Sequence, residues 1–73
     1  NKSTNIQYET IKSENVSFEI TNLLGELILN KNVSSKIGLN SIQVKTSHLS
    51  NGIYLYSISN GLTTSTKRLI VNH

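Results

Sequence analysis

The chain has 73 residues and a formal charge of +3, with four acidic residues, seven Lys and Arg, and no Cys, Pro or Trp. A chain of this length forms one domain and buries only about 60% of its unfolded surface, which excludes a large core with a deep pocket. The lack of Cys excludes disulfides and thiolate metal ligands, and no apolar run approaches the ~18 residues of a membrane-spanning helix.

The basic residues are spread along the chain between Lys2 and Arg68, and only Lys67-Arg68 forms an adjacent pair. This distribution indicates weak attraction to acidic surfaces and not the basic stripe of a nucleic-acid binder. The charged content of 15% argues against disorder. The chain has neither an initiating Met nor a signal-peptide pattern, so we expect residues 1–73 to be a piece cut from a longer protein.

Alternation of apolar and polar residues predicts the first strands. A strand over residues 6–11 is closed by a polar turn at 13–15, and residues 16–20 alternate most clearly. Gly25 marks a tight turn because glycine accepts a positive φ. Residues 27–33 then form the return strand.

The middle of the chain alternates less regularly. Residues 33–36 are predicted to be a loop, and residues 37–44 one strand that is interrupted by an offset. The alternation changes phase between Leu39 and Ile42, as a β-bulge or a change of sheet produces. Residues 46–52 are predicted to be a turn segment.

The last third contains the strongest strand, residues 53–59, followed by Asn60-Gly61. This dipeptide is typical of a type I′ hairpin turn, whose partner strand we expect over residues 63–71. About seven short strands at regular spacing predict an all-β sandwich or barrel. A helical face over residues 22–30 is the one rival, and a glycine interrupts it.

Side chains for catalysis or metal binding are sparse. The chain has no Asp or Cys, and its four Glu fall on different strands and turns. His48 lies in a predicted turn and is expected to be solvated, and His73 is the last residue. These residues predict no enzyme, no cofactor and no metal site.

Tyr54 and Tyr56 share one face of a strand, which is the geometry by which a nucleic-acid interface stacks bases. Ile58 shares that face, and no Lys or Arg is interleaved with the tyrosines. We therefore expect these tyrosines in the core or at its rim.

Two segments are more specific. In residues 49–56, we expect Leu49 to be buried and to anchor a loop. Gly52 permits the chain to reverse direction, and Tyr54 lies at the start of a core strand. At the end of the chain, two cations run directly into three apolar residues. The residues of this terminal segment are Lys67, Arg68, Leu69, Ile70, Val71, Asn72 and His73.

These features, in this order, resemble a known family. Residues 22–26 resemble its N-x-x-G-(Q/K/R/E) turn, residues 49–54 its L-x-x-G-(V/I)-Y element, and residues 67–71 its K-(K/R)-(I/L/F)-(I/V) strand. The family is the type A C-terminal sorting domain of the type IX secretion system of Bacteroidetes. The chain departs from it in lacking an initial Asn-Pro pair and in ending on Asn72-His73 where the family has a Lys.

The resemblance implies an immunoglobulin-like antiparallel β-sandwich, over residues 1–73, at the C-terminal end of a secreted cargo protein. It implies partners too: the type IX translocon, an outer-membrane shuttle β-barrel protein that recognises the C-terminal end, and a sortase that removes the domain. The cargo passes through the periplasm and is released or attached to surface lipopolysaccharide. No nucleic-acid partner and no membrane insertion of the domain itself are expected.

The mechanism we expect uses the last strand as a sheet edge that offers backbone groups and an apolar plug to the receptor. Lys67 and Arg68 steer it to an acidic rim, and residues 67–73 carry the signal. Gly25, Leu49, Gly52 and Tyr54 serve as structural motif residues. Deleting residues 69–73 is then expected to block export and leave the sandwich folded.

The alternative function is an extracellular carbohydrate- or protein-binding accessory module. Such a module needs an exposed aromatic platform or a calcium site, and the absence of Trp and Asp counts against both. Position in the parent protein separates the two functions, because a sorting domain must be C-terminal and a binding module can lie anywhere.

Overall fold

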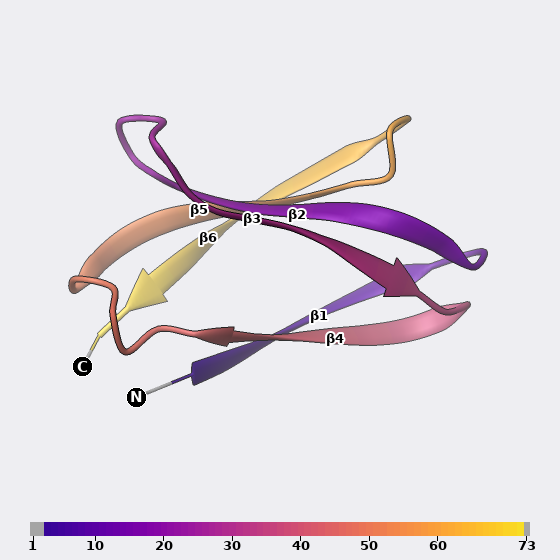
Figure 1. Cartoon of the computed structure of the whole chain (residues 1–73), viewed down its shortest axis with the longest axis horizontal. Helices are drawn as coiled ribbons and strands as arrows, with labels where there is room; N and C mark the ends of the chain where they lie inside the picture. The colour runs from indigo at the N-terminus through magenta and orange to yellow at the C-terminus, as the bar shows by residue number, and fades with distance from the viewer. Residues whose placement is uncertain (1–2, 73) are drawn as a thin grey trace.

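The computed structural model describes residues 3–72, which form six β-strands in two antiparallel sheets (Figure 1). None of these residues belongs to a helix long and apolar enough to cross a membrane. The strands are β1 (Ser3–Thr10), β2 (Glu14–Asn22), β3 (Leu27–Ser35), β4 (Gly38–Lys45), β5 (Gly52–Ser59) and β6 (Thr64–Val71).

The two sheets lie as two layers (Figure 1). One contains β1 and β4, paired in a single register from Ser3 with Lys45 to Thr10 with Gly38. The other has the order β3-β2-β5-β6, in which β2–β3 and β5–β6 are hairpins. Both outer strands of the larger sheet, β3 and β6, therefore have one edge that pairs with no described strand.

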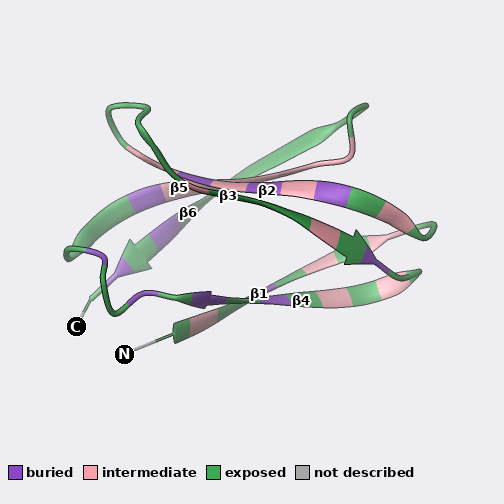
Figure 2. Cartoon of the chain, in the orientation of Figure 1, coloured by how far each residue is buried: buried purple, intermediate pink, exposed green. Residues whose placement is uncertain are grey.

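The core lies between the layers, and Figure 2 shows buried segments on strands of both sheets. The larger sheet contributes Phe18 and Ile20, which are both 0% exposed, and the smaller sheet contributes Ile6, Ile42 and Val44. Alternation places these residues on one face of each strand, so the predicted half-buried strand over residues 16–20 is confirmed.

Several boundaries differ from the predictions. The structure has six strands where about seven were expected, and Ile11, placed in the first strand, lies 94% exposed in the turn after it. Residues 33–36 were predicted to be a loop, yet β3 continues to Ser35. That extension is stabilised because the buried Ser35 hydroxyl bonds the Tyr8 hydroxyl at 2.6 Å.

The predicted offset in residues 37–44 is also wrong. β4 runs through without a register shift, and the phase changes because Leu39 faces outward, 65% exposed. The irregularity lies in the other sheet, where β2 shifts register against β3 between Ile20 and Thr21. Because the extra residue there is on β3, this is the position of the β-bulge.

The hairpin at Asn60-Gly61 has a longer loop than the predicted two-residue turn. Ser59 pairs with Thr64, so residues 60–63 form the loop. Gly61 has φ +92°, but no described residue other than glycine has a positive φ, which excludes the type I′ turn. The immunoglobulin-like arrangement stays a prediction.

Candidate functional site

β6 is the last strand of the chain and an outer strand of the four-stranded sheet. It pairs along its whole length with β5, with Val71 opposite Gly52, Ile70 opposite Ile53 and Leu69 opposite Tyr54. Its other edge pairs with no described strand, so backbone donors and acceptors there are open to a partner.

The two faces of β6 have different roles, a point that the sequence alone left open. Leu69 and Val71 face the core and are 8% and 4% exposed, whereas Ile70 faces outward and is 65% exposed. Lys67 and Arg68 are exposed. The apolar residues of the terminal segment therefore divide into two that anchor the strand and one that a partner can contact.

The end of β6 packs against buried residues of the segment 49–54. Leu49 and Tyr54 belong to the same buried cluster as Leu69 and Val71. The Tyr54 hydroxyl donates a 2.7 Å hydrogen bond to the Ser50 carbonyl oxygen, which closes the turn before β5. The segment is therefore a turn that leads into a strand, and Tyr54 is the buried residue of that strand.

The turn at residues 22–26 lies at the same end of the sheet, because Asn22 pairs with Tyr54. The Asn22 Oδ1 accepts hydrogen bonds of 2.9 Å from both Leu24 N and Glu26 N. Gly25 has φ +87°, a region that glycine adopts at least cost. The register Asn22–Tyr54–Leu69 thus brings together all three segments that carried the family resemblance.

Sequence reasoning missed an exposed apolar pair on the outer face of this end. Ile53 and Ile70 are directly opposite each other, 41% and 65% exposed. The signal was present in the alternation, since each residue adjoins a core residue in sequence, Tyr54 and Leu69. Asn72 is exposed, and His73 lies outside the described residues.

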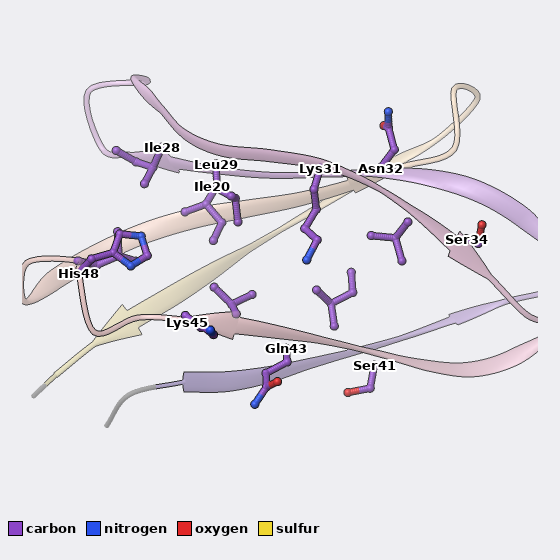
Figure 3. Close-up of a pocket in the computed structure, with 14 residues that line it drawn as sticks. Ile20, Ile28, Leu29, Lys31, Asn32, Ser34, Ser41, Gln43, Lys45 and His48 are labelled. Carbon is purple, nitrogen blue, oxygen red and sulfur yellow. The ribbon is translucent and has the colours of Figure 1, made fainter.

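Two grooves lie between the two sheets, one at each side of the molecule. One of about 320 Å³ lies between β1 and β6 and is lined by Lys67, Glu9 and Glu14 among others. The other, of about 690 Å³, lies between β3 and β4 and is shown in Figure 3. His48 is exposed at its rim, and within residues 3–72 no three His, Cys, Asp or Glu side chains lie close enough to hold a metal ion.

The arrangement defines a small all-β domain, in which a terminal edge strand with exposed cations packs on a turn and strand that contribute the buried Leu49 and Tyr54. Comparison with known families places this domain: the model described as "Secretion system C-terminal sorting domain" matches residues 1–72. The chain belongs to this family of type IX secretion sorting signals, which is not known for enzymes. No curated protein and no solved structure matches the chain.

Membership fixes the broad function. The chain is a C-terminal sorting signal of type IX secretion, which acts on a cargo in the same polypeptide and directs it to the cell surface or the extracellular space.

Proposed function

We propose that the secretion machinery reads this signal at β6 and the residues that follow it. The observation that carries the proposal is the division of β6 into a buried anchoring face and an exposed face at a free sheet edge. A receptor strand can add to that edge through backbone hydrogen bonds. Lys67 and Arg68 favour a receptor with an acidic rim.

The receptor in this proposal is the type IX translocon with its outer-membrane shuttle β-barrel protein, reached from the periplasm. Residues 1–73 act as one C-terminal domain, and a sortase removes it after passage. In Figure 1, β1 begins at the end of the molecule where β6 ends. A cargo joined ahead of β1 therefore lies beside the signal, which favours an approach from the outer face of β6.

The structure changes how the proposal must be tested. Leu69 and Val71 are core residues, so deleting residues 69–73 removes part of the fold together with the signal. Export lost by that deletion would not separate recognition from folding. Arg68 and Ile70 lie on the outer face, where substitution disturbs the core little.

The experiment fuses the whole chain to a periplasmic reporter in a type IX-competent bacterium and in a translocon mutant. The double variant Arg68→Glu with Ile70→Ser is expected to lower surface reporter about tenfold, the effect of ~1.4 kcal/mol of lost binding. The matched control is Lys12→Glu with Leu62→Ser, since Lys12 and Leu62 are exposed in loops away from the end of β6.

Periplasmic accumulation of the double variant, with normal export of the control, supports reading at β6. Wild-type export by a folded double variant would show that the machinery reads another surface. Surface reporter in the translocon mutant would contradict the type IX route itself.

A further inference from the structure

The groove between β3 and β4 has an apolar floor and two strand edges as its borders. Ile42, Val44 and Leu49 of the core line it, and its volume is about 690 Å³. This size falls within the about 300–1,000 Å³ of typical binding pockets. β3 is an outer strand of one sheet and β4 belongs to the two-stranded sheet, so backbone edges flank the groove.

Lys31 points into this groove from the middle of β3 (Figure 3). It pairs in register with the buried Phe18, which places it on the core-facing side of the sheet, yet it is exposed. Leu29 and Val33 lie on the same face to either side of it and are half-buried. The β3 edge therefore presents the order apolar, cation, apolar to anything placed beside it.

The charge around this groove has one sign. Lys45 lines the groove together with Lys31, and none of the described residues that line it is a carboxylate. The groove between β1 and β6 differs, since Glu9 and Glu14 face it together with Lys67. An inward lysine on an edge strand keeps apolar strands away. Because no carboxylate is among the described lining residues, the same lysine favours an anionic side chain from a partner.

We propose that the free edge of β3 binds an extended segment of a partner protein whose inward-facing side chains follow the order apolar, acidic, apolar. The segment adds a strand to the four-stranded sheet, and its backbone supplies hydrogen bonds to β3. Its two apolar side chains pack beside Leu29 and Val33 over the groove floor, and its carboxylate lies opposite Lys31.

The regular part of β3 fits a short segment. The bulge opposite Ile20 and Thr21 disturbs the first residues of β3, so regular pairing begins at Leu29 and continues to Ser35. A strand of about five residues spans the three inward positions.

A second copy of this chain is a poorer occupant than an acidic partner. β6, the opposite outer strand of the same sheet, carries Lys67 on its core-facing side, because Lys67 pairs with Tyr56 and Tyr56 with Ile20. A copy adding through β3 or β6 brings a lysine to a groove that already holds Lys31. Repulsion between the inward lysines disfavours a second copy of the chain, whereas an acidic strand is attracted to Lys31. The lysines therefore give specificity for an acidic partner. The β3 edge lies on the opposite side of the sheet from β6, so binding there is a function in addition to sorting.

The test is an NMR titration of the whole chain with two probe peptides, Thr-Val-Thr-Glu-Thr-Val-Thr and the same peptide with Lys in place of Glu. We expect saturable amide shifts along β3 and about fivefold tighter binding of the Glu peptide, weakened by salt. Lys31→Glu is expected to reverse the preference. Lys12→Glu, the same charge change in the exposed β1–β2 turn, is expected to keep it.

Equal affinity for the two peptides, or shifts centred on β1 or β6, would overturn the proposal. If inorganic phosphate causes the same amide shifts in β3, the groove binds anions in general and not an acidic strand. If the amide shifts depend on protein concentration without any peptide, the groove binds a second copy of the chain. If Lys31→Glu fails to fold, Lys31→Gln must abolish the difference between the peptides. None of these outcomes depends on export of the reporter. Recognition of β6 by the secretion machinery is therefore tested separately, by the reporter fusion.

Discussion

Phe18 is the side chain on which the packing of the two layers depends most. It is 0% exposed, and its ring lies 6.0 Å from that of Tyr56 at an interplanar angle of 42°. It stands at the centre of β2, between Ile58 of β5 and Lys31 of β3. It is also the only Phe in the chain, and no other aromatic of this size is fully buried among residues 3–72.

Phe18→Ala is expected to lower the free energy of unfolding by about 3–5 kcal/mol, because a large cavity replaces the ring. Leu24→Ala is the control, since Leu24 is 87% exposed and its truncation should change stability by less than about 0.5 kcal/mol. Urea denaturation followed by circular dichroism measures both. Equal losses for the two variants would contradict a core centred on Phe18.

At the scale of elements, the sequence predicted strands correctly where one face is buried and the other is solvated. Residues 16–20 follow that rule, whereas the strand over residues 53–59 is predicted by its dense run of Ile, Tyr and Leu. The rule failed at Leu39, an apolar residue on an exposed face, which imitated a bulge. It failed again at the end of β3, where an outer strand with few buried residues has the composition of a loop.

The turn chemistry was predicted in part. The Asn22–Glu26 turn was recognised because its glycine and asparagine act locally. At Asn60-Gly61 the side chain of Asn60 accepts hydrogen bonds from Leu62 N and Thr63 N, both 2.9 Å, which stabilises a longer loop than the dipeptide alone indicates. The terminal segment was found from its sequence, but its anchoring and exposed faces required the register with β5.

Asn22→Ala is expected to cost about 1 kcal/mol, because one side-chain oxygen accepts two backbone N–H groups in the β2–β3 turn. For a domain of this size, that loss lowers Tm by about 4–8 °C. Thermal unfolding measures it, with Asn30→Ala as the control at an exposed position of β3. The role given to Asn22 is wrong if both variants melt together.

At the scale of the whole molecule, the three motif segments meet because hydrogen-bonded strands carry them to one end of one sheet. Residues 22–26, 49–54 and 67–71 are far apart in sequence, yet the register places Asn22, Tyr54 and Leu69 in one row. This convergence gives a physical reason for the ordered motif set: the first two segments build the support on which the terminal strand is held.

Truncation of the terminal strand β6 removes part of the core. A domain of 73 residues has a total stability of about 4–11 kcal/mol. Losing a buried Leu or Val side chain costs about 1–5 kcal/mol, and deletion of residues 69–73 removes Leu69, Val71 and their pairing with β5. We therefore expect the truncated chain to lose its cooperative unfolding transition in urea.

Deletion of residues 72–73 is the matched control, because Asn72 is exposed and no described core residue is lost. It should keep both the transition midpoint and the slope of the wild-type chain. A cooperative, near-wild-type transition after deletion of residues 69–73 would show that β6 is dispensable for the fold. In that case the terminal strand would be a signal attached to an independent domain, and the buried face of Leu69 and Val71 would have no anchoring role.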